Sequence, residues 1–371
     1  MIIEMMSGGP PPKETGNAFL TSEELRNGGF QKVEAAHKVI KKVSDSIKND
    51  IFGQDEACDQ LALAIVRSRA GFSDPRKPKS IIMFLGPTGV GKTETAKALS
   101  KQIYGDSWEE RFTRIDCSQL SSPQSITKLS GSDPAYIGYG DQNTFFDSRK
   151  LDDGMVIDFD EIEKAHPSVW RWLLPVMDEG QASAITPVEN SSLIVPRGEL
   201  TTLNFRNSWL VFTSNIGAKQ MHEAVNGNSV GFAPSGGSSE VEAIGLRELR
   251  KQFRGMPEFL DRFRNFVVFK NLDMSSYGKI FDKYLEYINR NSKSGSLDVT
   301  VELREHLIKM AVGLGEQGAR KIGRVIDSEL ISKASEVLVS GALNGQGLLI
   351  GDIEDGQIIF WTLARATDIP H

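Results

Sequence analysis

The sequence predicts an α/β fold in which a parallel sheet carries helices on both faces and is followed by a smaller, mainly helical domain that ends in short strands. Three apolar, strand-like runs indicate the sheet, and they end in Gly86, in Asp160–Glu161 and in Thr213–Asn215. Helical patterns separate these runs and dominate after residue 268. Because ligands bind at the carboxyl ends of the strands in such sheets, the polar residues that end the runs are candidates for one shared site.

Composition and charge are those of an ordinary globular protein. The chain has 371 residues, enough for two domains, with 39% hydrophobic and 25% charged residues. Its net charge of −6 argues mildly against general nucleic-acid binding, which usually needs a basic face. Cys58 and Cys117 lie far apart without metal-ligand spacing, so we expect both to be buried apolar residues. The sequence shows neither a signal-peptide pattern nor an apolar run of membrane-spanning length, so we expect a cytoplasmic protein with no membrane partner.

The sequence predicts a tail followed by two domains. Residues 1–29 predict a flexible tail, because GGPPP and scattered polar residues offer little to bury. We assign the large α/β domain to residues 30–267 and the smaller domain to residues 268–371. Helical spacing of apolar residues predicts a helix near the start of the large domain and another in DQLALAIVRSRA. Near the end of the chain, GLLIGDIEDGQIIFWTLA predicts a hairpin that turns at Glu354–Gly356.

The strongest functional signal is the run from Ile81 to Thr93, IIMFLGPTGVGKT, which has the spacing G-x-x-x-x-G-K-T. Glycines let backbone N–H groups curl round a phosphate chain, and the helix that follows adds its positive end. Lys92 can reach the β- and γ-phosphates, and the Thr93 hydroxyl can bind Mg²⁺. A chance glycine-rich turn is the alternative, but the strand before the loop and the helix after it favour an ATP or GTP site. We expect the nucleotide to contact Gly86, Pro87, Thr88, Gly89, Val90, Gly91, Lys92, Thr93 and Glu94.

A pair of acids, Asp160–Glu161, ends the apolar strand in GMVIDFDEIEKAHPSV. Beside the phosphate loop, Asp160 can hold Mg²⁺ through water, and Glu161 can polarise the water that attacks the γ-phosphate. A surface acidic turn is the alternative, which the phosphate loop upstream disfavours. Asp158 shares the strand face of Asp160 inside an apolar run. Two interpretations of Asp158 stay open: a second acid that faces the metal, or a solvated strand end.

Three further polar residues are candidates for a catalytic role beside the phosphates. Asn215 ends the strand in NSWLVFTSNIGA, where its amide can orient the attacking water; a plain strand-to-turn asparagine is the alternative. Arg262, in PEFLDR, and Arg320, at the predicted start of a helix, are candidate stabilisers of transition-state charge. Taken alone, each arginine is more typical of a solvated surface.

In this order and spacing, these stretches resemble the second ATPase ring of the Clp family of AAA+ protein unfoldases, of the ClpA, ClpB and ClpC types. The resemblance runs from about Ile51 to about Trp361. DEIEKAHP and PEFLDR are its most discriminating motifs, because many unrelated NTPases share the phosphate loop. The other motifs are FGQDEA, RSRAGFSDP, FLGPTGVGKTE, FRNS, FTSNIGA and GAR. The resemblance implies an AAA+ P-loop NTPase module with a small lid domain, and ATP and Mg²⁺ as cofactors.

The resemblance also implies a role for each matching residue. The implied roles are adenine contact for Ile51 and Phe52, phosphate and Mg²⁺ binding for Lys92 and Thr93, metal-side acid for Asp160, catalytic base for Glu161, first sensor for Asn215, arginine finger for Arg262 and second sensor for Arg320. A finger that acts on the neighbouring subunit's ATP implies a ring, which in this family is a homo-hexamer.

The function that the resemblance implies follows from SDPAYIGYGDQ. Tyr136, Ile137 and Gly138 match the family's pore loop, which grips an extended polypeptide, although Ala135 stands where glycine is usual. A solvent-exposed tyrosine turn is the alternative. We therefore expect an ATP-hydrolysing hexameric unfoldase that threads polypeptide substrates through a central pore. A regulatory or assembly switch that does not thread substrates is the alternative function.

Two stretches bear on how far the resemblance extends. Residues 181–204 are longer than the family's usual hairpin before the first sensor, and their role is open. Val230, Gly231 and Phe232 lie in a Gly/Ser-rich stretch and resemble the tripeptide with which ClpC- and ClpA-type rings dock on the ClpP peptidase. An incidental apolar anchor is the alternative. We expect a single ATPase module in this sequence, which weakens the case for a full disaggregase.

Overall fold

The computed structural model of the protein describes residues 37–71, 74–131, 145–187, 198–225, 238–292, 295–313, 318–339 and 347–363. The chain divides into two compact units, residues 1–38 and 39–371. The second unit contains the sheets and the pocket. The domain boundaries predicted after residues 29 and 267 stay predictions. Three predicted segments lie outside the described residues: the tail at residues 1–29, the pore loop Tyr136–Gly138 and the tripeptide Val230–Phe232.

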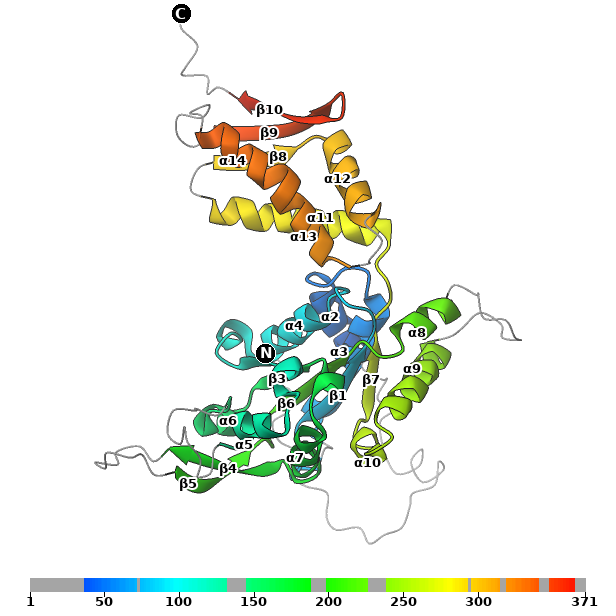
Figure 1. Cartoon of the computed structure of the whole chain (residues 1–371), viewed down its shortest axis with the longest axis vertical. Coiled ribbons are helices and arrows are strands. Elements are labelled where there is room, and N and C mark those ends of the chain that lie inside the picture. The colour runs from blue at the N-terminus through cyan, green and yellow to red at the C-terminus, as the bar shows by residue number, and fades with distance from the viewer. Residues whose placement is uncertain are drawn as a thin grey trace, which may run out of the picture. The chain divides into compact units, whose positions relative to one another are not determined.

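A five-stranded parallel sheet is the centre of the large domain (Figure 1). Its order is β2-β3-β6-β1-β7, so the strand that precedes the phosphate loop lies between β6 and β7. Every residue of β3 and β6 is buried, which explains why both sequences are nearly continuous apolar runs. The predicted α/β fold class is confirmed. The strands are β1 Ser80–Leu85, β2 Phe112–Asp116, β3 Val156–Asp160, β6 Trp209–Ser214 and β7 Asn265–Val268.

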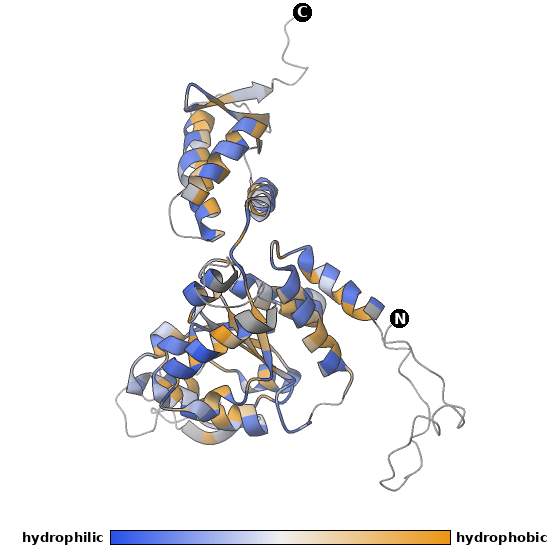
Figure 2. Cartoon of the chain, turned by 90° about the vertical axis from the view of Figure 1, so that its right-hand side faces the viewer, coloured by the Kyte–Doolittle hydropathy of each residue, from blue (hydrophilic) through white to orange (hydrophobic). Residues whose placement is uncertain are grey.

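Side chains alternate along β1 between two apolar layers. Ile82 and Phe84 pack on one face of the sheet with α2, α3 and α4, whereas Met83 and Leu85 pack on the other with α7, α9 and α10. Figure 2 shows apolar and hydrophilic residues side by side on the helices of the large domain, as expected of helices that cover a sheet. The helices are α2 His37–Lys48, α3 Asp55–Arg69, α4 Lys92–Tyr104, α7 Pro167–Glu179, α8 Ala218–Val225, α9 Ser238–Gln252 and α10 Pro257–Leu260.

Short elements connect these layers. The long segment predicted at residues 181–204 forms the two arms of an antiparallel hairpin, β4 Gln181–Pro187 and β5 Gly198–Asn204, and residues 188–197 lie outside the described part. Cys58 and Cys117 are free and buried, as predicted. The remaining connections are η2 Gly105–Ser107, η3 Cys117–Leu120, η4 Pro123–Ile126, α5 Thr127–Ser130, α6 Ser148–Asp153 and η5 Ile162–Lys164.

The smaller domain has an apolar core of its own, which includes Phe281, Leu303 and Leu330. Its β9 and β10 form the predicted hairpin, with Asp355 and Gly356 both at positive φ in the two-residue turn. Strand β8, which pairs parallel to β9, was not predicted. Among the described helices, none is long and apolar enough to cross a membrane. The elements are α11 Met274–Asn291, β8 Gly295–Val299, α12 Val301–Gly313, α13 Arg320–Val325, η6 Ile326–Ile331, α14 Ser332–Val339, β9 Gly347–Glu354 and β10 Gln357–Leu363.

Asp158 is fully buried in β3, so the interpretation as a solvated strand end is wrong. Neither of its carboxyl oxygens has a hydrogen-bond partner in the part of the chain that the structure describes. Burial raises the pKa of Asp158 well above its usual value, and the negative charge of Asp160 raises it further, while Arg114 acts in the opposite direction. The carboxyl group therefore keeps its proton in the folded protein at pH values where the unfolded chain has lost it.

We expect Asp158→Asn to flatten the pH dependence of stability. Because the folded-state pKa of Asp158 is raised, its contribution is complete below the unfolded pKa of about 3.9 and is lost as pH rises toward the folded value. The asparagine side chain has the same shape and cannot ionise, so the variant does not lose this contribution as pH rises. The melting temperature of the variant minus that of the wild type should therefore increase by roughly a few degrees from pH 5 to pH 8. Thermal unfolding across this pH range measures the difference, with Asp106→Asn at an exposed site as the control. Parallel curves for variant and wild type would show that Asp158 is ionised in the fold.

Candidate functional site

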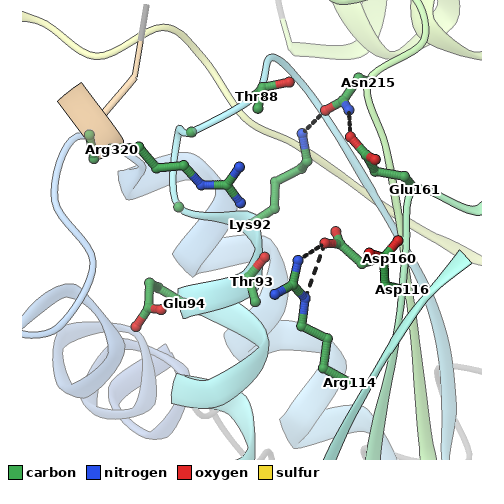
Figure 3. Close-up of a pocket in the computed structure, with 13 residues that line it drawn as sticks. Thr88, Lys92, Thr93, Glu94, Arg114, Asp116, Asp160, Glu161, Asn215 and Arg320 are labelled. Carbon is green, nitrogen blue, oxygen red and sulfur yellow. Dashed lines mark hydrogen bonds and ion pairs between the residues drawn. The ribbon is translucent and has the colours of Figure 1, made fainter. Parts of the chain in front are cut away.

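A pocket of about 330 Å³ lies at the carboxyl edge of the central sheet (Figure 3). Residues that end or follow β1, β2, β3 and β6 line it together with the first residues of α4 and α13. The pocket brings together ten of the residues predicted for the nucleotide site. They are Thr88, Gly89, Gly91, Lys92, Thr93, Glu94, Asp160, Glu161, Asn215 and Arg320.

Lys92 is buried at the start of α4, and its ammonium group has three acceptors. Nζ donates hydrogen bonds to the carbonyl oxygens of Gly86 (2.6 Å) and Pro87 (2.8 Å) and to Oδ1 of Asn215 (2.6 Å). Burial lowers the pKa of Lys92 to about 8, although nearby acids, Glu163 first among them, oppose the shift. The cation therefore lies folded back on its own loop, where a phosphate oxygen can replace these acceptors.

Asn215 connects Lys92 to the predicted base. Its Nδ2 donates to Oε1 of Glu161 (2.7 Å), and its backbone N–H donates to Oε1 of Glu163 (3.0 Å). Glu161 has a φ of 56°, in the left-handed region that non-glycine residues rarely adopt, and its N–H donates to Oγ1 of Thr213 (2.9 Å). Figure 3 shows Lys92, Asn215 and Glu161 as one continuous row of hydrogen-bonded groups. The Glu161 carboxylate is thus held at the pocket, where it can act on a water molecule.

Asp160 and Thr93 supply the oxygen atoms that a magnesium ion prefers. Mg²⁺ in nucleotide sites uses one or two protein oxygens and takes its other ligands from phosphates and water. In the described ranges no group of three or more His, Cys, Asp or Glu residues could hold a metal without such help. The residues therefore fit Mg²⁺ that arrives with a nucleotide.

The smaller domain reaches the phosphate loop through two glycines. Gly89 and Gly318 both have positive φ, and a Cβ on Gly318 would lie 2.8 Å from the Thr88 carbonyl oxygen. This close approach lets the Ala319 N–H donate to the Gly89 carbonyl oxygen (2.7 Å). Arg320 is the next residue, and Figure 3 shows its guanidinium pointing into the pocket from α13. The motif GAR thus combines a required glycine with a cation that points into the pocket.

Several predicted residues do not line the pocket. Ile51 is buried in the apolar layer with α3, and the Phe52 ring lies 5.6 Å from the ammonium group of Lys283. Gly86 and Pro87 contribute only the carbonyl groups that bind Lys92, and Val90 is buried.

Arg262 lies away from the pocket of its own chain, at the end of α10. Its Nε and Nη2 donate to the Asp178 carboxylate (3.2 and 3.0 Å to Oδ2), and its Nη1 donates to the Glu258 carbonyl oxygen. The guanidinium is therefore engaged by α7 and α10 of the same chain.

Besides Ala319, which contributes its backbone contact with Gly89, two pocket residues, Arg114 and Asp116, were missed by sequence reasoning. Both lie on β2, in FTRIDC, on the strand face that they share with Phe112. An acid at the end of an alternating strand was the available signal, of the same kind that identified Asp160. A basic residue two positions before it would have suggested an ion pair.

The comparisons with known proteins agree with this geometry. Residues 77–266, a little over half of the chain, match the family described as AAA domain (Cdc48 subfamily). The chain is 33% identical over 331 residues to the negative regulator of genetic competence ClpC/MecB of Bacillus subtilis (strain 168), with 88% of this chain and 38% of the relative covered. It is 30% identical over 328 residues to the chaperone protein ClpB of Clostridium perfringens (strain 13 / Type A), with 88% of this chain and 35% of the relative covered.

A third relative is the ATP-dependent Clp protease ATP-binding subunit ClpA homolog of Guillardia theta. The two chains are 33% identical over 323 residues, which cover 85% of this chain and 37% of the relative. The chain thus spans well under half the length of the curated relatives that it matches.

We expect Lys92→Ala to weaken ATP binding by roughly tenfold or more, because a charge-assisted hydrogen bond to the phosphates is lost. Titration with a fluorescent ATP analogue measures the affinity. Lys101→Ala is the matched control, since Lys101 lies on the same helix and pairs at the surface with Asp50, outside the pocket. Equal affinity of the Lys92 variant and the wild type would contradict the assignment of the phosphate site.

Proposed function

The chain belongs to the AAA domain family and, within it, to the Clp-type AAA+ ATPases, and on this premise we propose that it is a homo-hexameric, ATP-driven unfoldase that threads polypeptides through a central pore. One observation carries the proposal: Lys92, Asn215 and Glu161 form a connected row in one pocket, while Arg262 lies outside it. Such a division suits a site that each subunit completes for its neighbour.

The pocket residues have complementary tasks in ATP hydrolysis. Lys92 and Arg320 bring positive charge to the phosphates, and Glu161, oriented by Asn215, polarises the attacking water. Thr93 and Asp160 would hold Mg²⁺, which when bound supplies positive charge at the β- and γ-phosphates. Catalysis in such a site is positioning and electrostatic stabilisation, because the protein forms no covalent bond to the phosphate.

Work on a polypeptide is the second part of the proposal. It rests on the resemblance of Tyr136–Gly138 to a pore loop and on relatives named as a chaperone and as an ATP-binding subunit of a Clp protease. Docking of a ClpP-type peptidase at Val230–Phe232 stays a prediction from the sequence. A regulatory or assembly switch, in which ATP shapes a complex without threading, is the competing function.

Replacement of Tyr136 separates threading from switching. We expect Tyr136→Ala to slow the unfolding of a tagged fluorescent substrate by roughly tenfold or more while ATP hydrolysis continues, because the role proposed for this loop is to grip the substrate. Loss of substrate fluorescence and release of phosphate are measured in the same reaction. Tyr287→Ala, at an exposed tyrosine on α11, is the matched control, and Glu161→Gln should abolish both signals. Unfolding that survives Tyr136→Ala would favour the switch.

Arg262 is expected to act on the ATP of a neighbouring subunit. We expect Arg262→Ala to reduce ATP hydrolysis by roughly a thousandfold and to leave the affinity for ATP unchanged, because an arginine finger acts on the transition state. Arg264→Ala, two residues away at an exposed position, is the control.

Rings assembled from two variants show whether Arg262 acts on the ATP of the adjacent subunit or on that of its own subunit. Lys92→Ala subunits keep the finger, and Arg262→Ala subunits keep the pocket. An equal mixture should recover about a quarter of the wild-type hydrolysis if each pocket takes its finger from the adjacent copy in a closed ring. A mixture as inactive as its two components would place Arg262 in its own subunit's site and remove the trans mechanism.

A further inference from the structure

The metal-side acid of the pocket already has a cation beside it. Arg114, from β2, donates through Nε to Oδ2 of Asp160 (3.1 Å), and its Nη2 forms a short ion pair with the same oxygen. Figure 3 shows the guanidinium alongside the Asp160 carboxylate, on the side of Thr93 in the first turn of α4. The Asp160 side chain is only 11% exposed, whereas that of Arg114 is 43% exposed at the pocket wall.

The two oxygens of Asp160 differ in what can reach them. Oδ1 accepts a hydrogen bond from Oγ1 of Thr213 (2.6 Å), inside the sheet, and that hydroxyl oxygen also accepts the Glu161 N–H. Oδ1 is therefore part of the buried scaffold that positions the base. An ion or ion-bound water that uses Asp160 must approach through Oδ2, which is the oxygen that Arg114 occupies. The guanidinium and a divalent cation thus compete for one carboxylate oxygen.

A second carboxylate is available to receive the displaced arginine. Asp116 lies two residues after Arg114, so both side chains leave the strand on the same face. In the strand register Asp116 is opposite Asp160, and its carboxylate also lines the pocket. One oxygen of Asp116 accepts the Ser118 N–H (2.9 Å). Arg114 can therefore move between two acids of the same pocket by a change of side-chain rotamer.

We propose that Arg114 is a place-holding cation: it neutralises Asp160 until a divalent cation arrives with the nucleotide, and it then pairs with Asp116 inside the pocket. This role rests on the proposed ATP site and adds to it a residue that controls how readily the site takes up Mg²⁺. The pair keeps a nearly buried carboxylate neutralised before loading. It also makes metal loading depend on breaking one half-exposed ion pair, which is a modest barrier.

The affinity for a fluorescent ATP analogue, measured once in EDTA and once in saturating Mg²⁺, tests this role without reference to catalysis. We expect Arg114→Gln to bind the analogue roughly three- to tenfold more tightly than the wild type in Mg²⁺, because the metal no longer displaces an ion pair. The affinity in EDTA should not increase. Asp116→Asn should have the opposite effect, several-fold weaker binding in Mg²⁺ with little change in EDTA, because the displaced arginine has lost its acceptor.

The control is Arg111→Gln, which removes an arginine next to the same strand whose guanidinium donates to the carbonyl oxygens of residues 153 and 154, outside the pocket. Weaker binding of Arg114→Gln in both buffers would make Arg114 a plain phosphate ligand and overturn the proposal, as would unchanged affinity in both. If Arg114→Gln fails to fold, the Asp116→Asn result decides alone, and unchanged binding in Mg²⁺ overturns the proposal. A wild type that binds no nucleotide in either buffer would instead remove the ATP site itself.

Discussion

The buried ammonium group of Lys92 is the interaction on which the site depends. A buried cation is stable only among acceptors, and here they come from the loop after β1 and from Asn215 after β6. Strands β1 and β6 are neighbours, paired in register from Ser80 with Trp209 to Leu85 with Ser214. A shift of this register by one residue would turn the side chains of one strand to the other face and separate the cation from its acceptor. The strand pairing therefore sets the geometry of the catalytic groups.

This dependence explains which parts of the site the sequence predicts. Asp160 ends β3, and Glu161 and Asn215 directly follow β3 and β6, two strands that are buried throughout, so these polar residues stand out at the ends of mainly apolar runs. Strand β2 lies at the edge of the sheet and is only partly buried, so its Arg114 does not stand out from a solvated surface. That it lines the pocket follows from the strand order, which local sequence does not contain.

Burial depth and contacts between distant segments are likewise absent from a local pattern. An aspartate two residues before the end of a strand can be solvent-exposed or buried. Asp158 is buried because the sheet and the helices packed on it enclose its side chain. The need for glycine at position 318 comes from a loop more than two hundred residues earlier in the chain, since the Thr88 carbonyl oxygen leaves no room for a Cβ. The fold class and the nucleotide loop were predictable from composition and spacing, whereas these contacts required the packed structure.

Two of the three arginines proposed for the ATP site share a physical feature. Arg262 pairs with Asp178, and Arg114 pairs with Asp160, so each is held by a carboxylate of its own chain. The Arg262–Asp178 pair is partly exposed on both sides, and ion pairs of this exposure contribute about 0–1 kcal/mol, which is enough to favour one rotamer. For Arg262 the proposed competitor is phosphate, which arginine binds through charge-assisted, often bidentate hydrogen bonds, whereas for Arg114 it is the divalent cation proposed to take its place at Asp160. Each ion pair can therefore hold its arginine in one rotamer when no nucleotide is bound, and can break when a nucleotide binds.

The same reasoning extends to the contact between the phosphate loop and the smaller domain. Gly89 and Ala319 meet backbone to backbone, so no flexible side chain lies between them to absorb a displacement of the loop. The smaller domain has its own apolar core, and a packed core moves as a body rather than deforming. Arg320 follows the contact directly and lines the pocket, so a pocket cation and the contact between the two domains are adjacent in the chain. A displacement of the phosphate loop can therefore reach α13 through one backbone hydrogen bond.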